Sequence, residues 1–165
     1  GRSKAAAKIA AGEPFYHGKV RTFLLEKKHG KICCEAIHGM CGQDVYVFQE
    51  VLERSKSCAA GPGDTVVFFL HWSARGQPQA SSPLLRLSGP GGAPTLRGTV
   101  KTVGEGVGYL ECEDTMDFFG QDVYVEGELA AGLTPGQTVA FSVGLTEEGT
   151  PRVESLEPCE ESWQP

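Results

Sequence analysis

The amino-acid sequence predicts an all-β protein made of two consecutive, five-stranded antiparallel barrels. The first observation is an internal repeat: the string GQDVYV occurs at 42–47 and again at 120–125, 78 positions later. The second is the alternation of apolar and other residues with the period of a strand. The third is the content of 22 glycines and 10 prolines in 165 residues, which suits short strands joined by many turns.

The repeat extends well beyond this string. Fixed offsets join further residues of the two copies: Gly18 with Gly98, Gly30 with Gly108, Cys34 with Cys112, Pro62 with Pro135 and Gly76 with Gly149. The offset is 80 upstream, 78 in the middle and 73 downstream, so it changes only between blocks. Strands are therefore kept while loops vary in length, as expected of a duplicated domain. Closure of each copy into a small barrel would remove exposed sheet edges.

Each copy is predicted to contain five strands. They span residues 16–24, 30–36, 43–49, 64–72 and 77–87 in the first copy, and 96–103, 108–113, 121–126, 137–145 and 150–157 in the second. Because neighbouring side chains on a strand point to opposite faces, the valines of Val45-Tyr46-Val47-Phe48 should face the core and the aromatic residues outward. The residues expected inside are Val20, Ile32, Val45, Val47 and Phe68, and then Val100, Leu110, Val123, Val125 and Phe141.

Composition divides the chain into five segments. A flexible N-terminal arm is expected over 1–14, the first barrel over 15–87, a Gly/Pro linker over 88–94, the second barrel over 95–157 and an acidic tail over 158–165. No apolar run approaches the roughly 20 residues of a membrane span, so no membrane insertion is expected. The opening residues lack the apolar core of a secretory signal, and their Ala, Lys and Arg content fits a flexible tail, a helix-prone arm or a targeting remnant.

Charge is distributed unevenly along the chain. Residues 1–87 hold 12 Lys and Arg against 7 Asp and Glu, whereas residues 88–165 hold 3 against 14. The net charges of the two halves are therefore +5 and −11, which predicts that the halves have different partners. The first half suits a phosphate backbone, and the second would repel one.

Six cysteines are present, but only Cys34 and Cys112 occupy a shared position in the two copies. A disulfide framework would normally recur in both, so we expect free thiols in an intracellular, reducing compartment. That compartment is the cytoplasm, or a plastid or mitochondrion after removal of a transit peptide. Both shared cysteines have the strand parity of Ile32 and Leu110, and both should therefore be buried.

Neither a cofactor site nor a catalytic site is expected. The His and Cys residues between His29 and Cys41 lack the C-x2-C spacing that makes zinc patterns specific, and Cys33 and Cys34 should face opposite sides of a strand. A small barrel with short loops also offers little cleft for a Cys–His nucleophile. The sequence therefore predicts a binding protein with no catalytic residues, no metal and no cofactor.

The order of motifs is similar to that of the cold-shock domain family, whose pattern is G-x-V-K, K-G-F-G-F-I, D-V-F-V-H-F and a later G-x-x-V-x-F. The second copy matches it at 98–101, 105–110, 122–127 and 136–141, and the first copy at 18–21, 27–32, 44–49 and 63–68. The resemblance covers most of the chain and implies a cold-shock-like, OB-type barrel in each copy. It also implies binding of single-stranded RNA or DNA, with bases stacked on aromatic side chains of strands one to three.

The two copies keep different parts of that surface. Where the family has a tryptophan on strand one, this chain has Thr22 and Thr102. The first copy combines three candidate stacking residues with cations, and its expected nucleic-acid-binding residues are Lys19, Arg21, Lys27, Lys28, His29, Lys31, Tyr46 and Phe48. The second copy keeps a weaker face of Lys101, Tyr109 and Tyr124, where Glu111, Glu113 and Glu126 would repel phosphate.

Two functions are open on this evidence. In one, the chain is a non-catalytic tandem binding protein whose first barrel binds single-stranded RNA or DNA modestly, while the acidic second barrel acts as a scaffold or contacts a protein. In the other, the chain is an accessory structural subunit of a large assembly, and both barrels have lost nucleic-acid binding. The small number of aromatic residues on strands one to three is the feature that distinguishes the two functions.

Overall fold

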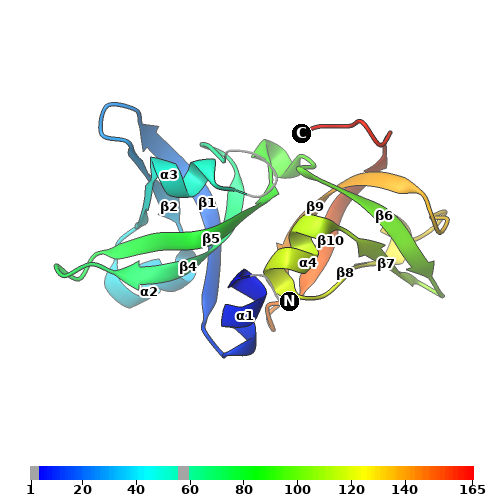
Figure 1. Ribbon diagram of the computed structural model, residues 1–165, viewed down its shortest axis with the longest axis horizontal. Helices are drawn as coiled ribbons and strands as arrows, with labels where there is room; N and C mark the ends of the chain where they lie inside the picture. The colour runs from blue at the N-terminus through cyan, green and yellow to red at the C-terminus, as the bar shows by residue number, and fades with distance from the viewer. Residues whose placement is uncertain (1–3, 56–59) are drawn as a thin grey trace. The chain divides into compact units, whose positions relative to one another are not determined.

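The computed structural model describes residues 4–55 and 60–165 and contains two closed β-barrels (Figure 1). Contacts divide the chain into two compact units, one of residues 7–86 and one of residues 87–165 together with the start of the chain. The all-β prediction is confirmed, and each strand lies within two or three residues of its predicted bounds. No described helix is long and apolar enough to cross a membrane.

The first barrel contains strands β1 (Phe15–Leu24), β2 (His29–Cys33), β3 (Val45–Phe48), β4 (Thr65–Trp72) and β5 (Pro78–Ser88). Around the barrel the strands follow the order β1-β2-β3-β5-β4. Three short helices accompany them: α1 (Lys4–Ala10) precedes β1, α2 (Glu35–Cys41) joins β2 to β3, and α3 (Gln49–Glu53) follows β3.

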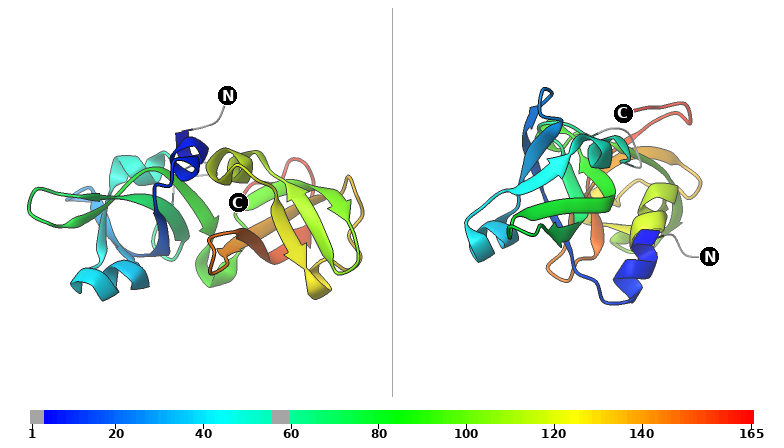
Figure 2. Two further views of the ribbon diagram at one scale, coloured as in Figure 1. Left: turned by 90° about the horizontal axis from the view of Figure 1, so that it is seen from below. Right: turned by 60° about the vertical axis from the view of Figure 1, so that its left-hand side comes forward.

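The second barrel repeats this plan with strands β6 (Leu96–Val103), β7 (Val107–Glu111), β8 (Val123–Glu126), β9 (Thr138–Leu145) and β10 (Pro151–Pro158). Their order is β10-β8-β7-β6-β9, which is the same circuit as in the first barrel. Figure 2 shows the ribbon from two further sides. Helix α4 (Glu113–Phe119) corresponds to α2, and the 3-10 turns η1 (Pro90–Gly92) and η2 (Gly127–Leu129) lie before β6 and after β8.

One pairing in each barrel corrects the expectation of a fully antiparallel sheet. Strand β3 pairs with β5 in parallel, through Tyr46 and Gln79, and β8 pairs with β10 in parallel, through Tyr124 and Arg152. The reason is parity: five strands cannot alternate in direction all the way around a closed circuit. The parallel pair brings β5 and β10 beside the outward aromatic residues of the third strand.

The predicted cores are confirmed. All ten residues expected inside the two barrels are 0–1% exposed: Val20, Ile32, Val45, Val47 and Phe68, and Val100, Leu110, Val123, Val125 and Phe141. Strands β3 and β8 alternate between buried valines and less buried outward residues. The strand parity that places the outward-facing residues is therefore correct.

Helices α2 and α4 were predicted as strand ends and loop, and this is a correction. Strands β2 and β7 end at Cys33 and Glu111, and a seven-residue helix begins two residues after each of them. Each helix is terminated by a glycine in the left-handed region, Gly42 at φ 73° and Gly120 at φ 75°, a conformation that glycine adopts without steric cost. These glycines begin the two GQDVYV strings, so the repeat marks a helix end followed by a strand.

The segments predicted outside the barrels contain structure and hydrogen bonds of their own. The expected flexible arm includes helix α1, in which Ala5 and Ala6 are buried and the Lys8 ammonium lies 4.7 Å from the centre of the Phe69 ring. In the expected linker, the carbonyl of Gly92 accepts a hydrogen bond from the Ser155 hydroxyl at 3.0 Å.

The acidic tail is likewise attached to the second barrel. Arg97 donates hydrogen bonds to the carbonyls of Glu161 and Trp163, the latter at 3.2 Å. The Cys159 amide donates to the Thr138 carbonyl at 3.1 Å, which prolongs the β9–β10 ladder into the tail.

Candidate nucleic-acid interface

The outer face of β1, β2 and β3 gathers most of the predicted site. Cross-strand pairing places Thr22, Lys31 and Tyr46 in one row and Leu24, His29 and Phe48 in the next. Both rows lie on the face opposite the valine core, because Gly30, Ile32, Val45 and Val47 have the other parity and are buried. Directly opposed side chains on one face of a sheet are within contact distance of each other.

His29 joins the aromatic residues of the two rows into one cluster. Its ring centre lies 5.6 Å from that of Tyr46 and 6.4 Å from that of Phe48, with both pairs edge to face. The His29 Nδ1 atom is 3.3 Å from the Lys27 carbonyl, so a proton on Nδ1 would be donated to it. Phe48 remains 42% exposed, which leaves a ring surface open to a stacking partner.

Four lysines surround this cluster. The Lys31 ammonium lies 5.6 Å from the centre of the Tyr46 ring, and Lys19 is exposed at the pairing of β1 with β2 opposite Cys33. Lys27 and Lys28 lie in the turn between β1 and β2, where Lys28 adopts a positive φ of 55° and its carbonyl accepts from the Gln49 amide. None of these four lysines forms an ion pair with another described residue, so all four can face a phosphate backbone.

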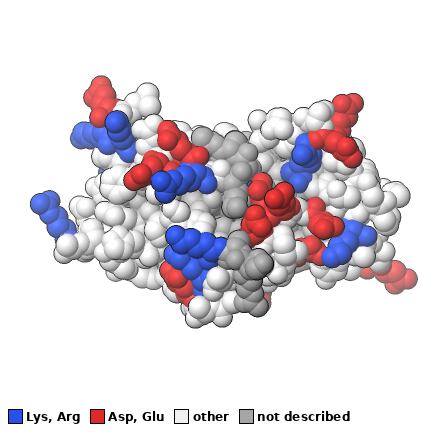
Figure 3. Space-filling model, viewed as in Figure 1, with Lys and Arg blue, Asp and Glu red and all other residues white. Residues whose placement is uncertain are grey.

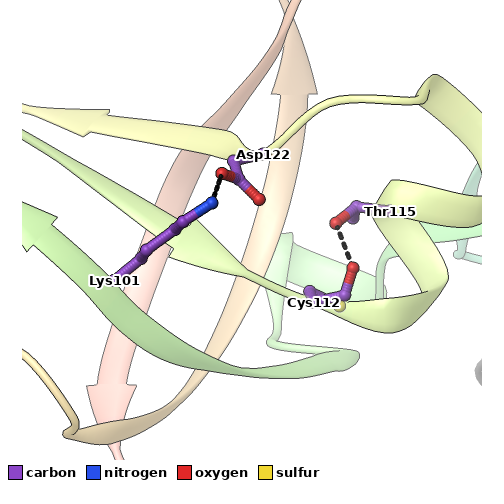
Figure 4. A network of polar contacts seen from close by, with 4 residues as sticks. All are labelled: Lys101, Cys112, Thr115 and Asp122. Atoms are coloured by element: carbon purple, nitrogen blue, oxygen red, sulfur yellow. Dashed lines mark hydrogen bonds and ion pairs between the residues drawn. The ribbon is translucent and has the colours of Figure 1, made fainter.

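Arg21 is placed differently from the lysines. Its guanidinium is paired with the Asp44 carboxylate at 3.3 Å, and the register of β1 against β2 shifts around it, which marks a bulge. The second barrel has the same arrangement: Lys101 donates to Asp122 at 2.9 Å, at the corresponding register shift of β6 (Figure 4). The hydrogen bond and the charge of Asp122 raise the pKa of Lys101. Duplication has therefore kept a cation–aspartate pair at each bulge.

The outer face of the second barrel holds the remaining predicted residues. Tyr109 lies opposite Tyr124, and it is also paired with Thr102. Tyr109 is 43% exposed. Glu111 and Glu126 lie on the same face two positions along their strands, with Glu126 opposite Val107 where the first barrel has Phe48 opposite His29. The second face thus keeps two tyrosines and replaces the rest of the aromatic cluster with aliphatic and acidic groups.

Three outward residues were missed by sequence reasoning. Leu24 pairs with His29 and is 49% exposed, and Gln79 and Arg152 flank the tyrosines through the parallel pairings. The offset of 73 that joins Gly76 to Gly149 already made Gln79 the counterpart of Arg152. The sequence did not show that the fifth strand pairs in parallel with the third, which is what brings these residues beside the tyrosines.

The shared cysteines are buried as predicted, with Cys34 at 1% and Cys112 at 5% exposure. Each stands at the start of a helix rather than within a strand, and the Thr115 hydroxyl donates to the Cys112 carbonyl at 3.1 Å (Figure 4). Burial raises the pKa of both thiols. Cys58 lies outside the described residues. Among those described, no three His, Cys, Asp or Glu side chains are grouped to hold a metal ion.

No family model matches the chain, and no curated protein does either. Among solved structures, it is similar to Drosophila Unr CSD456, with 19% identity over 90% of this chain and 63% of that chain, and a TM-score of 0.35. It is also similar to a multidomain protein with nucleic acid binding domains from Streptococcus pneumoniae, with 11% identity over 90% of this chain and 46% of that chain, and a TM-score of 0.32. The chain spans less than two thirds of the length of either protein.

Proposed function

We propose that the first barrel binds single-stranded RNA or DNA across the outer face of β1, β2 and β3. The observation that carries this proposal is the cluster of His29, Tyr46 and Phe48, whose rings lie within 6.4 Å of their neighbour and are bordered by unpaired lysines. Aromatic rings offer stacking surfaces to bases, and lysines attract the backbone that connects them. All three side chains face away from the barrel core, with Phe48 exposed and His29 and Tyr46 half-buried.

Two separable terms would make up the binding free energy. Stacking on an aromatic side chain contributes roughly 1–3 kcal/mol per base and depends little on salt. Contacts to phosphate release counterions, so their contribution falls as the salt concentration rises. With a small aromatic cluster and four lysines, the first barrel should bind modestly, and more tightly at low salt.

The test is a fluorescence anisotropy titration of the full chain with labelled single strands, both uridine-rich and of mixed sequence, across a range of salt. Tyr46→Ala or Phe48→Ala should each weaken binding by roughly 1–3 kcal/mol while leaving the salt dependence nearly unchanged. Tyr124→Ala, in the equivalent position of the second barrel, is the matched control and should change little. A DNA strand of the same sequence measures the preference between the two nucleic acids.

Absence of binding by the wild-type chain at low salt would refute the proposal. Equal losses in Tyr46→Ala and Tyr124→Ala would refute the assignment to the first barrel. If the wild-type chain does not bind, we would expect the outer face of β1, β2 and β3 to be a protein interface in a larger assembly. Its lysines would then face an acidic surface of the partner.

A further inference from the structure

The second barrel carries an outward-facing tyrosine pair that the proposed function does not use. Tyr109 and Tyr124 are directly opposed on β7 and β8, and Tyr109 is 43% exposed. Thr102 extends the row on one side and Arg152 on the other. Tyrosines presented in this way combine a flat aromatic surface with a polar tip, and such residues are enriched at binding interfaces.

The surroundings of this pair are acidic. Glu111 and Glu126 share the outer face with the tyrosines, two positions away along β7 and β8, and Glu113 begins the helix that follows β7. Acidic side chains outnumber basic ones by 14 to 3 in residues 88–165. Figure 3 shows acidic groups prominent over the second barrel, at the right.

All three cations of this half are already engaged. Arg97 binds carbonyls of the C-terminal segment, Lys101 is paired with Asp122 at 2.9 Å, and Arg152 lies 3.7 Å from Glu126. Glu111 and Glu113 form no ion pair with a described residue. The tyrosine face therefore carries more acidic than basic side chains, with Arg152 as the cation paired to Glu126.

We propose that this face, formed by Tyr109, Tyr124, Glu111 and Glu126, docks a basic, arginine-containing extended segment of a partner protein. A guanidinium group is planar and always charged, so it can stack on a tyrosine ring and form paired hydrogen bonds with a neighbouring carboxylate. Strands β7 and β8 each place a tyrosine and a glutamate two residues apart on this face. That is also the spacing of alternate side chains in an extended peptide. Phosphate groups would be repelled by the same carboxylates.

The experiment measures binding of a labelled arginine–serine repeat peptide to the full chain by anisotropy, with a lysine–serine peptide of equal length for comparison. A cation over an exposed aromatic ring is worth roughly a two- to fivefold change in affinity, so Tyr109→Ala should weaken binding by that factor. Tyr109→Phe keeps the ring and should retain most of the affinity. The lysine peptide should bind more weakly, because ammonium groups do not stack in a plane.

Charge variants separate the face from the general acidity of the barrel. Glu111→Gln should weaken peptide binding, whereas Glu147→Gln, in the exposed turn between β9 and β10, removes the same charge elsewhere and should have little effect. Arg152→Gln should strengthen binding, because it frees Glu126 and removes a cation from the face. Glutamine also stands at the equivalent position of the first barrel, Gln79, so the replacement suits the sheet.

Several results would overturn the proposal. Equal losses in Glu111→Gln and Glu147→Gln would mean that the peptide senses only net charge. No change in Tyr109→Ala, or weaker binding in Arg152→Gln, would exclude the tyrosine face. Self-association of the wild-type chain at low salt that Tyr109→Ala abolishes would identify a second copy of this chain as the occupant instead. Peptide binding should persist in Phe48→Ala, so failure of the nucleic-acid proposal would leave this one standing.

Discussion

The two cations at 19 and 21 on strand β1 should respond differently when they are neutralised. Lys19 is exposed and forms no ion pair with a described residue, while Arg21 is held 3.3 Å from the Asp44 carboxylate. Only a cation that neutralises a phosphate releases a counterion from the nucleic acid. Lys19→Gln should therefore flatten the salt dependence of single-strand binding, and Arg21→Gln should leave it nearly unchanged.

The magnitude follows from the number of lysines available. Each phosphate contact contributes about 0.7 to the slope of log affinity against log salt for a single strand, so four lysines give a slope of about 2.8. Lys19→Gln should reduce it to about 2.1 on the same basis. Asp44→Asn removes the partner of Arg21 and should steepen the slope by up to about 0.7, because the freed guanidinium can then reach a phosphate.

The assay is a set of anisotropy titrations with one labelled strand at several salt concentrations, and the readout is the slope rather than the affinity at one condition. Thermal unfolding of each variant at the same salt concentrations controls for loss of the fold. If Arg21→Gln flattened the slope as much as Lys19→Gln, or if Asp44→Asn left it unchanged, the ion pair would not withhold Arg21 from the nucleic acid and the reasoning would fail.

Three further predictions concern the barrels themselves. Gly30→Ala should destabilise the protein more than Gly108→Ala in chemical denaturation, because the added carbon would clash with the Thr22 carbonyl oxygen but lie 3.1 Å from that of Thr102. Overpacking costs typically about 1–3 kcal/mol. Phe141→Ala should cost about 3–5 kcal/mol in the same measurement, since its fully buried ring leaves a cavity. Native-state thiol labelling should modify Cys112 more slowly than Cys159, because Cys112 is buried. Burial also raises the pKa of Cys112 in the folded state, so the stability that this thiol contributes should be complete below the ordinary thiol pKa and fall as pH rises through the raised value.

The core and the strand faces were predictable because one alternation decides both. Once Val45 and Val47 were assigned to the inside, Tyr46 and Phe48 had to lie outside, and the repeat required the same at β8. The helices α2 and α4 were not predictable in this way. They are only seven residues long, too short for helical periodicity to show. The burial of Cys34 and Cys112 does not reveal the helices either, because it is expected both at the end of a strand and within one.

The sequence predicted on which face the candidate residues lie, but not how they pair with one another. Arg21 and Asp44 are 23 positions apart, and nothing local in the sequence joins them. The repeat did contain a signal, because a cation recurs at Lys101 and an aspartate at Asp122. Reading those four positions as two ion pairs requires knowing that the bulge of the first strand lies beside the start of the third.

The two barrels differ most where the fold constrains them least. Outward residues of β2 and β3 contribute little to the core, so the His29 and Phe48 pair of the first barrel can become the Val107 and Glu126 pair of the second without disturbing the strands. Each such replacement changes the charge and the aromatic surface of the face. Because the inward residues and the bulge ion pairs are kept, selection can act on one face at a time. A duplicated barrel of this kind can therefore present a cationic aromatic surface and an anionic aromatic surface within one chain.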